Sequence, residues 1–414
     1  MATRAPDMSP LSVSDPLDVS RAEIYRDHQW HEPFRRLRAE SPVYRCENSA
    51  FGPYWSVTTY KPIVHVESLP ELYSSSWQYG GITLADPKET ATFTMPMFIA
   101  MDRPEHTAER RTVAPAFTPS EMVRLSTSIR ERTAQLLDSL PLGARFDWVD
   151  TVSIELTTQM LAILFDFPWE DRRKLPYWSD WAGNIELVHN EETRQQRLNV
   201  LFEMGAYFKT LWAEKAKQPP GPDLISMMVH SEAMSHMDEH EFLGNLILLI
   251  VGGNDTTRNS MTGLAYGLNK FPEERAKLEA NPAIIPNAVS EIIRWQTPLA
   301  HMRRTATEDT ELEGQRIAKG DKLALWYISG NRDESVFPDA DRLIVDRENA
   351  RRHLAFGYGI HRCVGARLAE LQLSILLEEM AKRRLRVNVL DEPDRVAACF
   401  VNGYRSLPVE LSRY

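Results

Sequence analysis

The sequence predicts a mainly α-helical protein with a minor sheet component. Most of the chain carries apolar residues at helical spacing, interrupted by proline and glycine clusters such as "KQPPGPD" at 217–223, which end helices. Segments that read as strands occur near the C-terminus and at three earlier places: 54–60, 304–314 and 322–328. Since 414 residues can bury a large core, we expect a single domain over 17–414 after a poorly ordered tail at 1–16.

The charge and the cysteine content exclude several classes of protein. The 48 Lys and Arg residues against 58 Asp and Glu residues leave a net charge of −10, which disfavours nucleic-acid binding. The N-terminus lacks the apolar core of a signal peptide, and the longest apolar run, 246–251, is too short to span a bilayer, so we expect a cytoplasmic protein. Cys46, Cys363 and Cys399 match no zinc or redox spacing, which predicts free thiols, one of them a possible ligand or nucleophile.

The first of four helices that matter for chemistry begins at Pro104 and ends before Pro115, because proline is favoured at the first position of a helix. It carries His106 and Arg110. These two residues are four positions apart and therefore lie on one face of the helix. Both side chains can reach the same anion.

The second helix follows Asp238, which has an acidic residue three positions later in a capping-box arrangement. Its residues 246–251 are apolar on every side, so this turn lies inside the protein. Gly252 and Gly253 follow directly, although each glycine costs about 1 kcal/mol relative to alanine in a helix interior. We therefore expect a functional reason for these glycines and for the polar residues that come next.

The third helix begins at Pro286 and ends before Pro298, and it carries Glu291 and Arg294 three residues apart. The fourth helix follows Cys363. Its apolar residues recur at spacings of four, three and four and predict one face turned to a core: Val364, Leu368, Leu371 and Ile375.

Cys363 lies where a glycine-rich loop becomes a helix, in "FGYGIHRCVGARL". The free N–H groups at a helix start stabilise a thiolate. A lone buried cysteine is ordinarily a small apolar residue, and a nucleophilic thiol would need a base that His361 is poorly placed to provide. A thiolate that is the only protein ligand of a metal is typical of iron held by a macrocycle.

A haem group would also explain the charges and the glycines elsewhere in the chain. Haem propionates need cations, and four candidates lie on three separate elements: His106, Arg110, Arg304 and His361. The flat face of the macrocycle needs a close backbone, which Gly252 and Gly253 can supply.

Asp255 and Thr256 then fall beside the metal, as an acid and a hydroxyl able to relay protons to dioxygen. The alternative for Thr256 is a hydroxyl bonded to the backbone of the preceding turn, as is common in helices. Both readings stay open from the residues alone.

These segments together resemble the cytochrome P450 superfamily of haem-thiolate monooxygenases. "FGYGIHRCVG" fits its cysteine-loop signature Phe-x-x-Gly-x-x-x-Cys-x-Gly, and "GGNDTT" resembles its distal-helix pattern Gly-x-acid-Thr-Thr. "EIIR" matches Glu-x-x-Arg, and "HTAER" looks like the propionate-binding His-x-x-x-Arg helix of bacterial members. The resemblance covers essentially the whole chain. It implies a triangular prism of helices with small sheets, and haem b held between the long distal helix and the cysteine-loop helix.

The resemblance also implies roles for individual residues. Cys363 becomes the axial ligand of the haem iron, with Asp255 and Thr256 as the catalytic pair. Glu291 and Arg294 join Arg342, in "FPDADRL", in a buried triad that holds the fold. The implied haem contacts are His106, Arg110, Arg304, His361, Phe356 and Gly252.

The substrate pocket can be expected in the segments that line it in the family. There the chain offers mainly aliphatic and thioether side chains, which suit a hydrocarbon held by burial: Ile82, Leu84, Met95, Met97, Leu248, Val251, Ala300, Met302 and Phe400. The segments around the motifs look like the soluble bacterial subfamily that hydroxylates alkanes and fatty acids at the terminal carbon. A terpene or steroid hydroxylase is the alternative substrate class.

Electrons must come from partner proteins, because nothing flavin-like is present in the chain. We expect an iron–sulfur ferredoxin with its NAD(P)H-dependent reductase. Basic residues flanking the cysteine loop can dock an acidic ferredoxin: Arg111, Arg352, Arg362 and Arg367.

Two other classes of function share parts of these patterns. "HMDEH", at 236–240, matches the His-x-x-Glu-His pattern of a zinc peptidase group, but no third ligand is evident. A haem sensor or carrier without enzymatic activity would share the cysteine loop. Such a protein has no need of Asp255 and Thr256, because it does not deliver protons.

Overall fold

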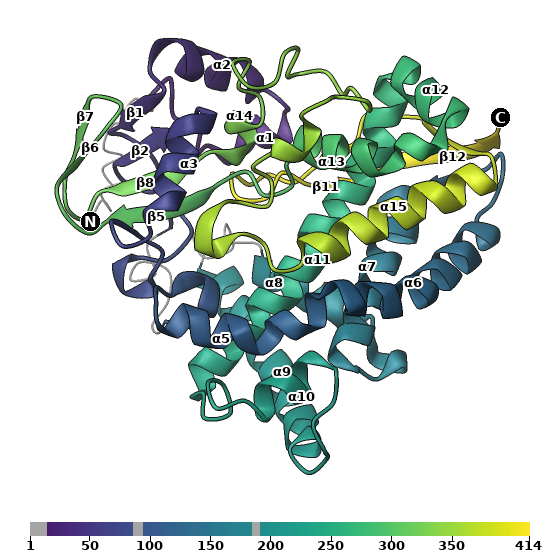
Figure 1. Ribbon diagram of the computed structural model, residues 1–414, viewed down its shortest axis with the longest axis horizontal. Helices are drawn as coiled ribbons and strands as arrows, with labels where there is room; N and C mark the ends of the chain where they lie inside the picture. The colour runs from purple at the N-terminus through teal and green to yellow at the C-terminus, as the bar shows by residue number, and fades with distance from the viewer. Residues whose placement is uncertain (1–14, 86–93, 184–190) are drawn as a thin grey trace, which may run out of the picture.

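Helix α11, Glu239–Lys270, passes through the centre of the molecule, and most of the other elements pack around it (Figure 1). The computed structural model describes residues 15–85, 94–183 and 191–414. The outline is roughly triangular, with the largest sheet at one side (Figure 1). The prediction of a mainly helical protein with small sheets is confirmed. The expected tail falls outside the described residues except for Asp15, which accepts a hydrogen bond from the Tyr44 hydroxyl at 2.7 Å, and Pro16.

Helix α11 begins where its capping residue predicts. The Asp238 carboxylate accepts hydrogen bonds from the backbone N–H groups of His240 at 2.8 Å and Glu241 at 2.9 Å, which satisfies donors that have no partner inside the helix. The apolar turn that follows is buried as expected, at Leu246, Ile247, Leu249 and Ile250.

The other helices lie before and after α11 in the chain. Those before it are α1 (Ala22–Arg26), α2 (His31–Glu40), α3 (Tyr60–Ser68), α5 (Glu105–Val113), α6 (Pro119–Ser139), α7 (Glu155–Phe165), α8 (Lys174–Gly183), α9 (Glu191–Lys215) and α10 (Leu224–Val229). Those after it are α12 (Pro272–Ala280), α13 (Ile285–Gln296), α14 (Tyr327–Gly330) and α15 (Ala366–Lys382). The helices predicted from Pro104, Pro286 and the cysteine loop are therefore confirmed as α5, α13 and α15.

The strands form small sheets at the edges of the helical body. They are β1 (Val43–Cys46), β2 (Tyr54–Val57), β3 (Tyr73–Ser74), β4 (Arg145–Asp147), β5 (Met302–Ala306), β6 (Thr310–Leu312), β7 (Gln315–Ile317), β8 (Lys322–Leu325), β9 (Leu385–Val389), β10 (Asp394–Arg395), β11 (Tyr404–Ser406) and β12 (Pro408–Arg413). The largest sheet has the order β1-β2-β8-β5-β3, with β2 and β8 parallel. In it Arg304 of β5 lies opposite Leu323 of β8.

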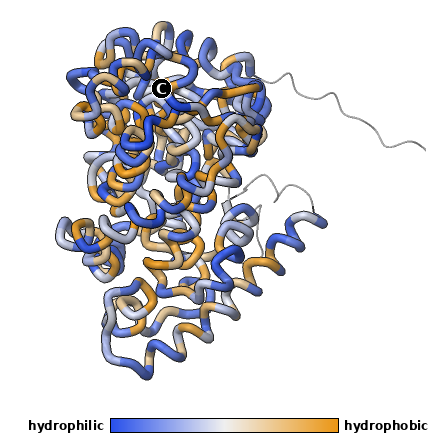
Figure 2. The backbone as a smooth tube through the Cα atoms, turned by 90° about the vertical axis from the view of Figure 1, so that its right-hand side faces the viewer, coloured by the Kyte–Doolittle hydropathy of each residue, from blue (hydrophilic) through white to orange (hydrophobic). Residues whose placement is uncertain are grey.

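Two large apolar clusters meet on α11. One joins the first half of α11 to helices α5 to α10 and to Leu368 and Ile375 of α15. The other joins its second half to α13, α15 and the C-terminal strands. Figure 2 shows hydrophobic stretches recurring along the helices, with hydrophilic residues at many outer bends. The predicted apolar face of α15 is confirmed, since Val364 and Leu371 also pack against the first cluster.

The buried triad includes a different arginine from the one predicted. Arg294 donates from Nε to Glu291 Oε2 at 2.7 Å, and both side chains have no exposed surface. The third member is Arg347, whose Nε lies 3.0 Å from both carboxylate oxygens of Glu291. Arg342 is half-exposed and pairs with Glu273 on the surface. The prediction of Arg342 was wrong because that residue contributes its backbone: its carbonyl accepts from Arg294 at 2.9 Å, which leaves its side chain turned outward.

Candidate functional site

A cavity of about 430 Å³ lies between α11 and the loop that precedes α15. Its walls also come from α5, α7, the end of α8, β5 and the segments around Trp77 and Phe400. These parts are distant in sequence. The motifs predicted to form one site are therefore brought together by the fold.

Cys363 faces this cavity from the loop, and for that reason its side chain is accessible although it lies deep in the protein. Its N–H donates to the Phe356 carbonyl at 2.8 Å. Gly359, at φ +65°, lets the loop pack on α3: a Cβ there would lie 2.2 Å from the Glu67 carbonyl oxygen. Burial raises the pKa of the Cys363 thiol, against the effects of the Gly365 N–H and Arg110. A coordinated metal cation would overcome that preference and deprotonate the thiol.

His106 and His361 form a pair at one edge of the cavity, with ring centroids 4.2 Å apart. All four of their ring nitrogens are buried without a hydrogen-bond partner. Burial, with Arg110 nearby, lowers the pKa of His106 to about 4, and burial, with Arg304 nearby, lowers that of His361 to about 2. Buried polar groups of native proteins are nearly always hydrogen-bonded. The N–H group of each neutral ring therefore requires an acceptor from a ligand.

Two arginines line the cavity beside the histidines. Arg110 donates to the Arg362 carbonyl. Arg304 donates to Glu67 Oε1 at 2.9 Å, and the same oxygen accepts from the Tyr327 hydroxyl at 2.6 Å. Glu67 on α3 thus orients Arg304 toward the cavity. Sequence reasoning missed Glu67, because it belongs to no motif and lies in a helix that also carries the polar residues Lys61 and His65.

The adjacent glycines Gly252 and Gly253 of α11 face different neighbours. Gly252 is exposed in the middle of the central helix because it faces the cavity, and a Cβ added there would meet nothing within 4 Å. Gly253 faces α7 instead, where a Cβ would lie 2.8 Å from Leu161 Cδ2. Gly252 therefore leaves room for a flat group close to the helix, and Gly253 permits close packing between helices.

Thr256 lines the cavity, one turn after Gly252. Its hydroxyl donates to the Gly252 carbonyl at 2.9 Å. This is the hydrogen bond to the preceding turn that the sequence offered as the alternative. The oxygen of that hydroxyl still has lone pairs that can accept from a group in the cavity.

Asp255 is buried next to Thr256 and is held mainly by Ser179 and Arg258, with Asn254 Nδ2 at 3.4 Å. Ser179 donates to it at 2.8 Å, and Arg258 lies 3.1 Å from the same oxygen. Arg258 also pairs at 2.8 Å with Asp180, which is exposed. Burial raises the pKa of Asp255, although Arg258 opposes the shift. Two ion pairs, Asp255–Arg258 and Arg258–Asp180, thus connect the cavity with the surface.

The residues around the cavity fit a haem. The thiol can ligate one metal position, and Gly252 makes space for a planar ring. Phe356 lines the same wall. The unpartnered histidines and the arginines suit an anionic edge.

The expected substrate pocket is largely brought together. Seven of the nine predicted residues line the cavity: Ile82, Met95, Met97, Leu248, Val251, Met302 and Phe400. Leu84 and Ala300 do not, and these two predictions were wrong. Both are fully buried in a separate cluster with Trp30 and Trp326. Residues 86–93, within the expected pocket loop, lie outside the described residues.

Several lining residues come from helices that carry no motif and were therefore missed. They include Trp77, Phe117, Met160, Leu161, Leu164, Arg197 and Leu224. Helices α7, α9 and α10 reach the cavity only through tertiary packing.

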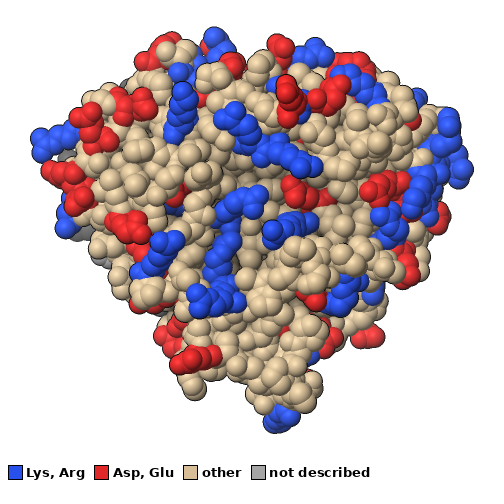
Figure 3. Space-filling view, in the orientation of Figure 1, with Lys and Arg blue, Asp and Glu red and all other residues tan. Residues whose placement is uncertain are grey.

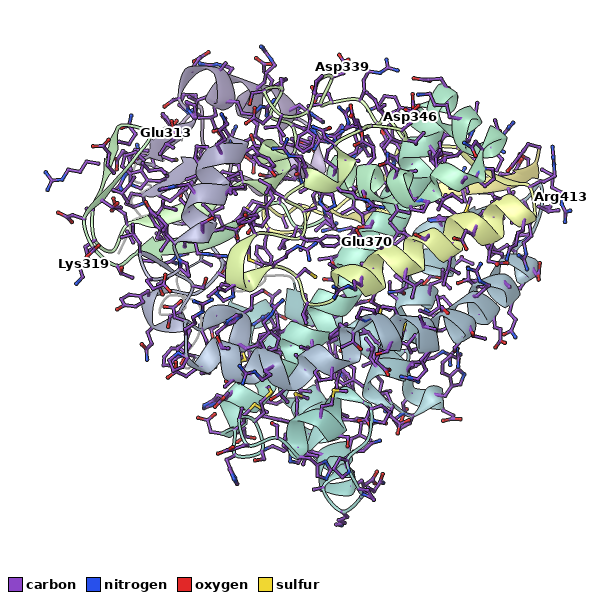
Figure 4. All side chains as sticks on the ribbon, in the orientation of Figure 1. Glu313, Lys319, Asp339, Asp346, Glu370 and Arg413 are labelled. Carbon is purple, nitrogen blue, oxygen red and sulfur yellow. The ribbon has the colours of Figure 1, made fainter. Side chains whose placement is uncertain are left out.

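The four arginines predicted for docking are exposed, and Figure 3 shows basic side chains grouped in the middle of the face that carries α5 and the cysteine loop. Glu370, labelled in Figure 4, lies on α15 near this group. Burial raises the pKa of Glu370 above its usual value, although Arg362, Arg351 and Arg367 oppose the shift. The face is therefore locally basic although the chain is acidic.

The segment at 236–240 serves as a helix start, because Asp238 caps α11. Within residues 15–85, 94–183 and 191–414 no three His, Cys, Asp or Glu side chains are grouped so that they could hold a metal ion. The zinc-peptidase alternative thus has no ligand set in those ranges. Among the same residues no helix combines the length and apolar character needed to cross a bilayer.

Known proteins resemble this chain in sequence and in structure. A model of the family described as Cytochrome P450 matches residues 189–394. The structure of CYP153D17 from a Sphingomonas species is 73% identical, with a TM-score of 0.92 over 96% of this chain and 100% of that chain. Linalool 8-monooxygenase from Pseudomonas putida is 36% identical over 402 residues, 95% of this chain and 98% of the relative. Methyl-branched lipid omega-hydroxylase from Mycobacterium tuberculosis is 32% identical over 394 residues, 92% of this chain and 90% of the relative.

Proposed function

Since the chain belongs to the cytochrome P450 family of monooxygenases, we propose that it inserts one oxygen atom of O₂ into the terminal C–H bond of a medium-chain alkane or fatty acid. The apolar wall of the cavity carries this proposal. Leu248, Val251, Met95, Met97 and Phe400 offer burial and no hydrogen-bonding group, so they suit an unbranched hydrocarbon. The similarity to a lipid omega-hydroxylase supports attack at the chain end.

We propose haem b as the cofactor of this protein. When bound with a thiolate ligand, it supplies the iron chemistry that cleaves the O–O bond. Cys363 would hold the iron, and His106, Arg110, Arg304 and His361 would bind the propionates. We propose that residues 17–414 form one domain, which is supported by cavity walls that come from Trp77 through to Val401.

The protein's own contribution to the reaction is the delivery of protons and the exclusion of water. Asp255 is held by Ser179 and Arg258, and the link through Asp180 to the surface can resupply it with protons. Thr256 presents its hydroxyl oxygen to the cavity and can accept and pass on a hydrogen bond. The apolar wall keeps bulk water from the reacting carbon.

Replacing Thr256 with alanine tests the proton delivery. Positioned proton transfer contributes about 10²-fold or more to a rate, and water can replace part of this, so we expect the fraction of consumed NAD(P)H that appears as product to fall roughly tenfold. The measurement compares NAD(P)H oxidation with product formation. Thr256→Ser, which keeps the hydroxyl, is the control. Equal coupling in wild type and Thr256→Ala would remove Thr256 from this role.

Product analysis tests the substrate class. The holoenzyme with ferredoxin, reductase and NAD(P)H is incubated with medium-chain alkanes, medium-chain fatty acids, linalool and a steroid. We expect terminal alcohols from the first two classes and a Soret shift on binding them. The alternative is terpene hydroxylation, which the similarity to linalool 8-monooxygenase favours. Turnover of linalool or the steroid with none of the straight-chain compounds would replace the proposal with the alternative class.

We propose that an acidic iron–sulfur ferredoxin donates the electrons to this enzyme and is itself reduced by an NAD(P)H-dependent reductase. Arg111, Arg352, Arg362 and Arg367 lie exposed on the face that carries the cysteine loop. This face is the natural docking surface, because it lies nearest to Cys363 and is locally basic. Charge complementarity would speed encounter with the partner.

A further inference from the structure

Arg197 on α9 is a charged residue in the cavity wall that the reaction described above does not use. Four of the other charged or titratable lining groups, His106, Arg110, Arg304 and His361, gather at the edge assigned to the propionates. Asp255 is held by Ser179 and Arg258. Among the described residues, Arg197 forms no hydrogen bond or ion pair with either group.

The guanidinium of Arg197 is held in place by the end of α8. Its Nε donates to the Trp181 carbonyl at 3.0 Å, and its Nη2 donates to the Ala182 carbonyl at 2.8 Å. These bonds use two of its five donors. They fix the plane of the guanidinium and leave Nη1 without a hydrogen-bond partner among the described residues.

Within the described ranges no carboxylate neutralises this cation. Among the described residues no Asp or Glu lies within ion-pair distance of Arg197, whereas Arg194, one turn earlier on the same helix, pairs with Glu191. Burial lowers the pKa of Arg197 to about 10. A partly desolvated charge without a counter-ion is costly, and native proteins normally pair such charges. A ligand with an anionic group would supply the missing partner.

The position of Arg197 relative to the cavity defines the kind of ligand. The end of α8 packs on α11, where a Cβ on Gly183 would lie 3.2 Å from Val251. Arg197 and Cys363 line the same cavity, and the wall they share is mainly apolar, with Leu161, Leu164 and Leu248 among its residues. A ligand that joins Arg197 to the reaction site must therefore be an apolar chain with one anionic end.

We propose that Arg197 binds the carboxylate of a fatty acid whose hydrocarbon chain extends through the cavity toward Thr256. This inference rests on the proposed function and narrows it from alkanes or fatty acids to fatty acids. The carboxylate anchors one end of the chain, so the opposite end is the part presented for oxidation. Terminal attack follows from that anchoring.

Ligand binding to three matched probes tests the site. The holoenzyme and its Arg197→Gln variant are titrated with a medium-chain fatty acid, its methyl ester and the alkane of equal carbon number, and Kd is taken from the Soret shift. Glutamine keeps an N–H donor for the α8 carbonyls but has no charge. Because hydrogen bonds to charged groups are the stronger class, we expect the ratio of the fatty-acid Kd to the alkane Kd to rise roughly 10- to 100-fold. The surface variant Arg194→Gln should leave this ratio unchanged.

Each other outcome is decisive. An equal weakening of all three probes in Arg197→Gln would make Arg197 only a cap of α8 and would overturn the carboxylate site. An unchanged ratio of the two Kd values would also overturn the carboxylate site. The proposed terminal hydroxylation would still stand in that case if the wild type converts alkanes. If the wild type binds none of the three probes yet turns over linalool, the proposed function itself fails.

Discussion

Cys363→Ser is expected to abolish the thiolate signature of the haem and with it the monooxygenase activity. Serine lacks the soft, electron-donating sulfur that ligates iron in haem-thiolate proteins. Substitutions outside the first ligand sphere already lower metal affinity by about 10- to 100-fold, so loss of the ligand itself should cost at least ~100-fold in haem affinity. The reduced, CO-bound wild type should absorb at the red-shifted position of thiolate-ligated haem, and the variant should not.

Cys46→Ser is the matched control for this experiment. Cys46 is fully buried in a cluster with Trp30 and Tyr54, and it does not line the cavity. We expect the control to keep the red-shifted absorption and the activity. A red-shifted spectrum retained in Cys363→Ser would show that another residue ligates the iron.

Arg347→Ala is expected to destabilise the protein strongly, whereas Arg342→Ala should have little effect. Arg347 contacts both carboxylate oxygens of the fully buried Glu291. Removing one partner of a buried ion pair leaves an uncompensated charge and costs about 3–5 kcal/mol. Arg342 pairs with Glu273 at the surface, where both side chains are half-exposed, and exposed pairs contribute about 0–1 kcal/mol.

The two arginine variants form a matched pair, because they lie five residues apart in the same loop and lose the same type of side chain. The free energy of unfolding is measured by urea titration, with circular dichroism as the signal of unfolding. A larger loss in Arg342→Ala than in Arg347→Ala would mean that Arg342 completes the triad after all.

Local chemistry made several elements predictable. Asp238 caps α11 because its short carboxylate reaches the free N–H groups two and three residues later. The cysteine loop was recognisable because few residues other than glycine adopt the positive φ angles found at Gly357 and Gly359. For Thr256 the sequence leaves two roles open: a proton relay beside the metal, or a hydroxyl bonded to the preceding turn of the helix. In the structure the hydroxyl is bonded to the backbone and the residue lines the cavity.

The errors concern side chains whose direction depends on distant segments. Arg342 and Arg347 lie in the same loop after Pro338, and the sequence does not say which one turns toward Glu291. Ala300 is predicted to line the pocket because it belongs to the piece after Pro298, one of the segments expected there, but its backbone N–H donates to the Phe400 carbonyl and its side chain packs in another cluster.

The sequence by itself therefore determined the helical class, the starts of the main helices, the thiol at Cys363 and the order of the motifs. These features depend on caps, spacing and backbone preferences that act over a few residues. Only the tertiary structure decided that Glu67 orients Arg304, that Arg347 completes the triad and that Arg197 reaches the cavity. Those contacts join segments far apart in the chain, and they form only when the helices pack around α11 and bury their charges together.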